Sequence, residues 1–167
     1  MTHSLTDGGG RRTLHAWILI AALILLQFLL FRQQLVREIL WSYPANHDQV
    51  NFLQLSQETQ HHMLTDGFWK GVGVTLRSPK PSSFMLPIQG GLVYYFLGPQ
   101  RINALMLVFA YFALLQVVLA FSVHRLTGRW SASFIALGLL IGTSSRFFFA
   151  GGLADFRADG IASYLYV

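Results

Sequence analysis

The sequence predicts an all-α, polytopic membrane protein, from two features of composition and one of pattern. The residues AVILMFWYC make up 53% of the 167 positions, and charged residues make up only 11%, against about 25% in soluble domains. Three long apolar runs approach the roughly 20 residues that cross a bilayer. The twelve Lys and Arg are scattered between these runs, so we expect no basic face for nucleic acid. Cysteine is absent, which excludes disulfides and thiolate metal sites.

The first span is predicted at residues 16–31, after a cytoplasmic tail at residues 1–15. Its apolar run is interrupted only by Gln27. A cleaved signal peptide would have a similarly short apolar core, but it would need small residues at a cleavage site. The residues that follow, RQQLVR at 32–37, provide none. We therefore expect a span that stays in the protein.

Two further spans are predicted at residues 102–123 and 131–149, joined by a cytoplasmic turn at 124–130. The third span contains Gly138 and Gly142, which have the small-xxx-small spacing. This spacing either lets another helix approach closely in lipid or reflects the ordinary glycine content of membrane helices.

A fourth apolar run begins at residue 161, and the sequence ends at residue 167. Seven residues cannot cross a core about 30 Å thick at 1.5 Å per residue. We interpret residues 161–167 as the start of a fourth span, and the chain as the N-terminal part of a longer protein.

The orientation follows from the basic residues of the short segments. The N-terminal tail and the 124–130 turn each carry two arginines, so the positive-inside rule places both in the cytoplasm. Segments 32–101 and 150–160 are then extracytoplasmic. These two segments hold six of the seven acidic residues: Glu38, Asp48, Glu58, Asp66, Asp155 and Asp159. We expect a multi-pass protein of a cell membrane, of the bacterial inner-membrane type.

The long outward segment 32–101 is predicted to form amphipathic helices rather than a linker. Its apolar stretch at 84–98 is interrupted by Pro87 and by the pair Gly90 and Gly91, which favours an interfacial or re-entrant helix. The alternative is that 84–98 crosses the bilayer, which would invert the orientation of everything after it.

Asp48 lies at the start of a predicted helix in this segment. Asn46 and Gln49 have the spacing of a capping box, and an acidic residue in the first turn is favoured by the helix dipole alone. The functional alternative is an acid held at the membrane surface, as a base or as a cation ligand. Helical spacing places the following residues on one face: Asp48, Phe52, Leu55, Thr59 and His62.

Asp155 and Asp159 form a second acidic spot. Their spacing of four puts both on one face of a helix, where they repel unless a positive charge lies between them. A divalent cation, a substrate amine or Arg157 could supply that charge. The alternative is that these residues simply begin the next helix.

The histidines prompt a question about zinc, which needs three or four ligands in fixed geometry. His47, His61 and His62 lie in the same outward segment, followed by Asp66. Neighbouring His61 and His62 point apart on a helix, and no HExxH spacing occurs, so we expect no metal site. The sequence also has no P-loop, GxSxG or dinucleotide-binding motif.

The order of these features resembles the GT-C glycosyltransferases, in particular the family-39-like group with protein O-mannosyltransferases and lipid A aminoarabinose transferases. Residues 43–49 are similar to the family's first-loop acidic motif, 79–98 to its proline-containing apolar region, and 151–159 to its second acidic loop. The resemblance covers about residues 17–167. Where the family commonly has an Asp-Glu pair, this sequence has Asp48 followed by Gln49.

The resemblance implies transfer of a sugar, with inversion, from a polyprenyl-phosphate donor to an extracytoplasmic acceptor. Asp48 fits the general base, and Asp159 fits the second acid, with Asp155 as the alternative position. The cations that could hold the donor phosphate are Lys70, Arg77 and Lys80, although interfacial anchoring alone also explains them. The implied partners are the lipid-linked donor and membrane lipids, with a divalent cation as an open cofactor.

Two other classes stay open. A transporter would line its path with polar groups inside the spans, and here only Gln27 and Gln116 lie deep in them. A membrane assembly protein would carry no chemistry.

Overall fold

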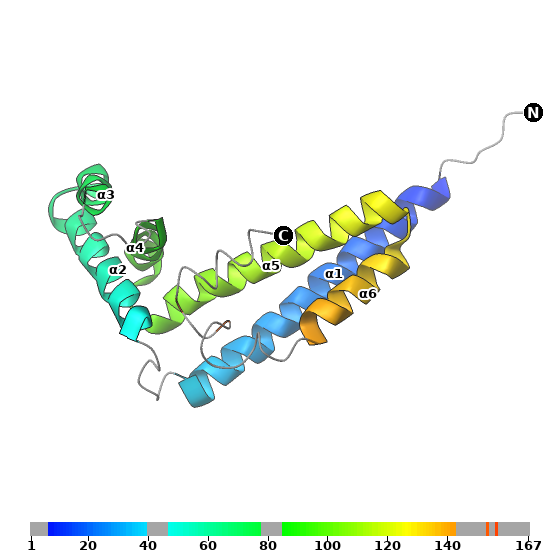
Figure 1. Cartoon of the computed structure of the whole chain (residues 1–167), viewed down its shortest axis with the longest axis horizontal. Coiled ribbons are helices and arrows are strands. Elements are labelled where there is room, and N and C mark those ends of the chain that lie inside the picture. The colour runs from blue at the N-terminus through cyan, green and yellow to red at the C-terminus, as the bar shows by residue number, and fades with distance from the viewer. Residues whose placement is uncertain (1–6, 40–46, 78–84, 143–152, 154–155, 157–167) are drawn as a thin grey trace, which may run out of the picture.

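The computed structural model describes residues 7–39, 47–77, 85–142, 153 and 156 of the chain (Figure 1). Within them the predicted all-α class is confirmed, and no strand occurs. The elements in chain order are α1 (Asp7–Gln34), the π-helical η1 (Leu35–Ile39), α2 (His47–Thr65), α3 (Phe68–Leu76), α4 (Met85–Leu97), α5 (Arg101–Thr127) and α6 (Trp130–Gly142). Two of them are long and apolar enough to cross a membrane: α5, and α1 together with its extension to Arg37.

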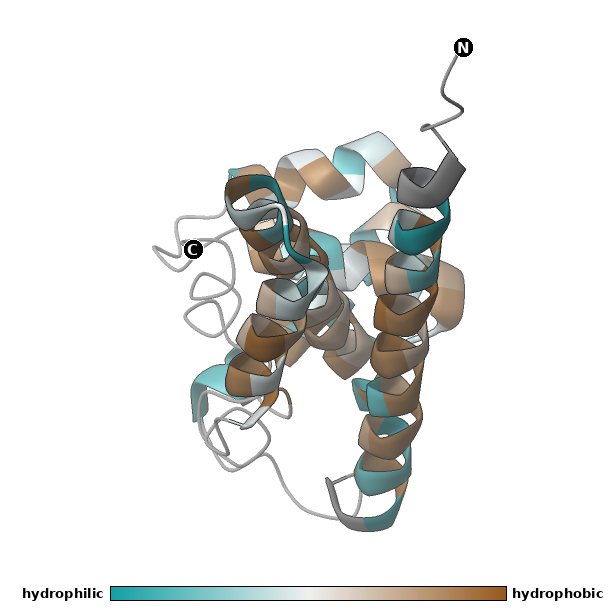
Figure 2. Ribbon diagram, turned by 90° about the vertical axis from the view of Figure 1, so that its right-hand side faces the viewer, coloured by the Kyte–Doolittle hydropathy of each residue, from teal (hydrophilic) through white to brown (hydrophobic). Residues whose placement is uncertain are grey.

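Helix α1 is longer than the predicted span 16–31 at both ends. It begins inside the segment expected as a tail, and it continues into η1. In Figure 2 its middle is apolar and both of its ends include polar residues. Extending an existing helix adds one hydrogen bond for each residue ordered, so the helix runs past the apolar residues that predicted it.

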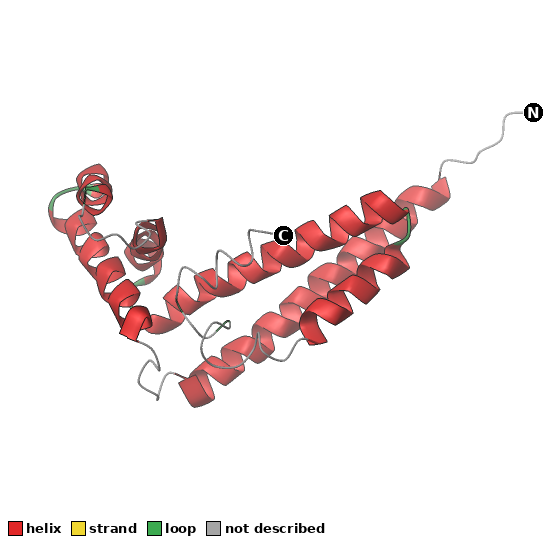
Figure 3. Cartoon of the chain, in the orientation of Figure 1, coloured by secondary structure: helices red, strands yellow, loops and turns green. Residues whose placement is uncertain are grey.

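The turn between α5 and α6 is shorter than the predicted 124–130 segment. Helix α5 extends to Thr127, and only Gly128 and Arg129 separate it from α6 (Figure 3). Gly128 adopts φ +67°, a left-handed conformation that costs glycine little. Its N–H donates to the carbonyl of His124 at 2.8 Å, which closes the helix end. The last seven residues of the predicted third span, 143–149, lie outside the described residues.

Helices α1, α5 and α6 run side by side as a bundle (Figure 1). Ile20, Ala120 and Leu137, one from each helix, form its buried centre. The hydroxyl of Ser133 on α6 donates to the carbonyl of Ala120 on α5 at 2.9 Å. This hydrogen bond and the buried side chains fix α6 against α5.

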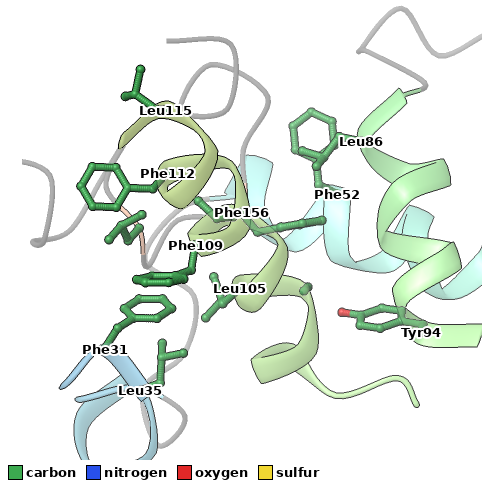
Figure 4. Packing of buried hydrophobic residues seen from close by; sticks show 13 residues of the cluster. Phe31, Leu35, Phe52, Leu86, Tyr94, Leu105, Phe109, Phe112, Leu115 and Phe156 are labelled. Atoms are coloured by element: carbon green, nitrogen blue, oxygen red, sulfur yellow. The ribbon is translucent and has the colours of Figure 1, made fainter. Parts of the chain in front are cut away.

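Helices α2, α3 and α4 gather at one end of this bundle, and α2 crosses its direction there (Figure 1). Buried side chains from this layer and from the bundle meet in one cluster (Figure 4). Phe31 comes from the end of α1, Leu35 from η1 and Phe109 from α5, while Phe52 and Leu86 come from α2 and α4. At 13 residues, α4 is shorter than the roughly 20 residues a span needs, which favours the interfacial interpretation of 84–98.

The glycines at which described helices approach closely are not the two with the small-xxx-small spacing. A Cβ at Gly71 would lie 2.5 Å from the Met63 nitrogen, and one at Gly91 would lie 2.7 Å from Cγ2 of Thr59. At Gly138 and Gly142 a Cβ would meet nothing within 4 Å. Among the described residues, therefore, neither Gly138 nor Gly142 provides a close contact between helices.

Candidate functional site

Asp48 lies in the first turn of α2 with its side chain exposed. The next residue, Gln49, is buried, and its Oε1 accepts a hydrogen bond from Nη2 of Arg101 at 3.4 Å. Arg101 is the first residue of α5. This contact joins the start of α2 to the start of a helix of membrane-crossing length, so Asp48 lies where the α2–α4 layer meets the bundle. The predicted cap, Asn46, lies outside the described residues.

The buried face of α2 does not coincide with the face on which helical spacing groups Asp48 and His62. Its buried residues are Gln49, Phe52, Ser56, Thr59 and Met63. Asp48 is exposed and His62 is partly exposed. Of the five residues that helical spacing placed on one face, only Phe52 and Thr59 are among the buried residues of α2. Gln49 and Ser56 were missed because a polar side chain does not signal burial; Ser56 satisfies its hydroxyl by donating to the carbonyl of Phe52 at 2.7 Å.

Tyr94 on α4 is buried beside this junction. Burial raises the pKa of its phenol to about 12, and the positive charge of Arg101 partly opposes that rise. The Tyr94 side chain therefore stays neutral at physiological pH. Its carbonyl accepts a hydrogen bond from Nε2 of Gln60 on α2 at 2.8 Å. These contacts fix α4 against α2 close to Arg101.

Two residues of the predicted second acidic segment, 150–160, are described, and both lie at the same end of the molecule. Leu153 and Phe156 are fully buried in the cluster of Figure 4. A Cβ at Gly90 on α4 would lie 3.0 Å from Cζ of Phe156, so the phenylalanine packs directly on the α2–α4 crossing. Asp155 and Asp159 themselves lie outside the described residues.

The three cations predicted to hold a donor phosphate are not gathered around Asp48. Lys70 is exposed at the start of α3, and its neighbour Gly71 packs on Met63, about 22 Å along α2 from Asp48 at 1.5 Å per residue. Arg77 follows α3 and is nearer the middle of α2, since the Thr75 and Thr59 hydroxyls of the two helices are 2.8 Å apart. Lys80 lies outside the described residues.

Arg101 is a cation at the Asp48 end of α2, and it is not among the cations that the sequence predicted. Only its position, directly before a long apolar run, could have indicated it. A positive residue there looks like an ordinary membrane-interface anchor. Its contact with Gln49 joins residues 52 positions apart, so no local pattern indicates it.

His62 and Asp66 form a separate pair at the other end of α2. Nδ1 of His62 is 3.0 Å from Oδ2 of Asp66, one helical turn along. This hydrogen bond is the main cause of the lowered pKa of the Asp66 carboxyl. The positive charge of nearby Lys70 lowers that pKa further. Among the described residues, no group of three or more His, Cys, Asp and Glu is placed to hold a metal ion.

An apolar groove of about 470 Å³ runs between α1 and α5. All of its lining residues are apolar, from Trp17 to Phe28 on α1 and from Phe109 to Val117 on α5. Phe109 stacks on Phe31 with ring centroids 5.4 Å apart, so one end of the groove adjoins the buried cluster below the α2–α4 layer. A groove of this lining suits a hydrocarbon chain.

Comparison with protein-family models, with curated proteins and with solved structures finds no match to this chain. Function is therefore inferred from the residues and their geometry.

Proposed function

We propose that this chain belongs to a membrane glycosyltransferase that moves a sugar from a polyprenyl-phosphate donor to an extracytoplasmic acceptor. The observation that carries the proposal is the position of Asp48. It is an exposed carboxylate at the junction between a layer of short helices and the end of two helices of membrane-crossing length. A base at that level reaches the headgroup of a lipid-linked donor while the lipid tail stays in the bilayer.

In the proposed reaction, the Asp48 carboxylate takes the proton of an acceptor hydroxyl. The acceptor oxygen attacks the anomeric carbon of the sugar, and the bond from that carbon to the phosphate oxygen breaks with inversion. The electron pair leaves on the polyprenyl phosphate. A base contributes about 10²–10⁴-fold to such a step, and positive charge on the departing phosphate contributes electrostatically. Arg101, at the same end of α2, supplies positive charge near this point.

Two further observations support a lipid-linked donor. The apolar groove between α1 and α5 offers a place for a prenyl tail. Phe156, which lies between Asp155 and Asp159 in the sequence, packs on the α2–α4 crossing in the layer that carries Asp48. In this proposal these acids bind the acceptor or a divalent cation. Lys70, Arg77 and Lys80 hold distal parts of the donor or the lipid surface.

A transporter is less well supported by the same structure. Gln27 on α1 and Gln116 on α5 are buried, and their side chains hydrogen bond each other. Amides that satisfy each other in this way line no path through the described part of the bundle.

The test is Asp48→Asn in membranes that contain the protein, assayed with a panel of polyprenyl-phosphate sugars. We expect transfer to fall by about 10²-fold or more, since an amide cannot accept the proton, while expression and membrane insertion stay unchanged. Glu58→Gln is the matched control, because Glu58 is an exposed acid on the same helix with its partner Gln54 one turn away. Wild-type turnover in Asp48→Asn would contradict the base assignment. A wild-type protein inactive with every donor would contradict the transferase proposal itself.

A further inference from the structure

Three exposed aromatic rings, the half-buried ring of Phe68 and an exposed leucine form a continuous edge where α3 begins and α4 ends. This aromatic edge consists of Phe68, Trp69, Tyr95, Phe96 and Leu97. The ring centroids of Phe68 lie 5.1 Å from Trp69 and 5.6 Å from Tyr95, and those of Tyr95 and Phe96 lie 5.2 Å apart, all in edge-to-face contact. Trp69 is 81% exposed, Phe96 74% and Leu97 62%. Scattered apolar residues on a surface need no explanation, but a contiguous apolar patch marks a contact surface.

The layer of α2, α3 and α4 also has a polar surface, which lies on α2 rather than on the aromatic edge. Exposed positions in the middle of α2 are occupied by polar side chains: Asn51, Gln54, Gln57, Glu58 and His61. Helix α4 contains no charged residue, and α3 contains only Lys70. The layer therefore has a face suited to water on α2 and an edge suited to an apolar medium on α3 and α4.

The aromatic edge lies close to the start of a helix of membrane-crossing length. Leu97 ends α4, and Arg101 begins α5 after three linking residues, a connection that spans at most about 15 Å at 3.8 Å per residue. Nδ2 of Asn103 donates to the carbonyls of both Leu97 and Gly98 at 2.9 Å, so α5 holds the end of α4 in place. Aromatic side chains are enriched at this level of membrane proteins, where apolar spans meet the headgroups.

We propose that the aromatic edge inserts into the headgroup–acyl boundary of the phospholipid bilayer in which α1 and α5 reside. The rings of Trp69 and Phe96 then lie among the upper acyl segments. The polar face of α2 stays in water, and exposed Lys70 and Arg77 are placed for anionic headgroups. Because the layer is anchored at this edge and at Arg101, α2 and Asp48 are held at a fixed depth relative to the bilayer. This inference does not depend on the proposed sugar transfer.

The test is depth-dependent quenching of Trp69 fluorescence in the purified chain, reconstituted into phosphatidylcholine–phosphatidylglycerol vesicles. The emission of Trp69 is obtained as the difference between wild type and Trp69→Phe, since three other tryptophans remain. We expect lipids brominated near the headgroup to quench most of this emission and aqueous iodide to quench little. Quenching by iodide alone would overturn the proposal, because Trp69 would then face water. Quenching by neither agent would also overturn it, because the edge would then be covered by protein.

Two further variants serve as controls that distinguish a misfolded mutant from a true negative result. Both are made in the Trp69→Phe background. Phe96→Trp places a second probe on the aromatic edge, and it should repeat the bromolipid result. Gln57→Trp places the probe on the exposed polar face of α2, and it should be quenched by iodide and not by brominated lipid. Identical behaviour of the two probes would contradict a layer with one lipid-facing edge.

Discussion

At the scale of single residues, the two glutamines inside the apolar helices form the most informative pair. Nε2 of Gln27 donates to Oε1 of Gln116 at 2.9 Å, and Nε2 of Gln116 donates back to Oε1 of Gln27 at 3.1 Å. Both side chains are buried. In an apolar surrounding, each amide would carry a desolvation penalty without the other. The pair therefore sets which faces of α1 and α5 meet.

Replacing both glutamines should cost less than the sum of the two single replacements. We expect Gln27→Leu or Gln116→Leu to lower the free energy of unfolding by about 1–3 kcal/mol, because the remaining amide is left buried without its partner. The double variant should lose less than the sum, by a coupling of about 0.6–1.7 kcal/mol, the range for interhelical hydrogen bonds in membranes. Thermal unfolding of the three variants in one detergent measures this coupling. Additive losses would show that the two amides act independently.

At the scale of elements, the crossing of α2 and α4 depends on the absence of side chains at two glycines. A Cβ at Gly90 would lie 2.8 Å from Cβ of Ser56 and 3.0 Å from the Phe156 ring, and Gly91 meets Thr59 in the same way. The two helices approach closely only because Gly90 and Gly91 have no Cβ. Phe156 packs at the same contact, so this residue adjoins the layer that carries Asp48.

Gly90→Ala should therefore destabilise the fold, whereas Gly138→Ala should not. Overpacking of this kind costs about 1–3 kcal/mol, and alanine recovers at most about 1 kcal/mol of helix propensity. A Cβ at Gly138, on α6, would meet nothing within 4 Å, so alanine there should be neutral or stabilising by up to about 1 kcal/mol. Melting temperatures in detergent compare the two variants. Equal melting temperatures would mean that the α2–α4 crossing tolerates a wider separation.

At the scale of the whole molecule, the chain consists of a bundle of apolar helices with a layer of short helices across one end (Figure 1). The contact of Gln49 with Arg101 and the cluster of Figure 4 join the two parts. The opposite end of the bundle holds the short turn at Gly128, with His124 stacked on Trp130 at 3.9 Å between ring centroids. The positive-inside rule predicts that this turn is cytoplasmic and that the layer is outside.

Cysteine labelling tests that orientation cleanly, because the chain has no cysteine of its own. Gln57→Cys reports on the exposed face of α2, and Leu126→Cys reports on the 85% exposed position next to the turn. In intact cells, a membrane-impermeant maleimide should label Gln57→Cys and leave Leu126→Cys unlabelled. In inverted vesicles the pattern should reverse. Labelling of both variants from one side would place the layer and the turn on the same face of the membrane and contradict the predicted topology.

The sequence by itself determined the helical class, the two helices of membrane-crossing length and the helix starting next to Asp48. Apolar runs, helical periodicity and a glycine at a helix end are local signals, and each acts within a few turns of helix. Only the tertiary structure decided that Gln27 pairs with Gln116, that Gly90 rather than Gly138 permits a close crossing, and that Arg101 rather than Lys70 lies at the Asp48 end of α2. The physical reason is that these contacts depend on which helices become neighbours and at what angle they cross. Those properties arise from the packing of side chains far apart in the chain.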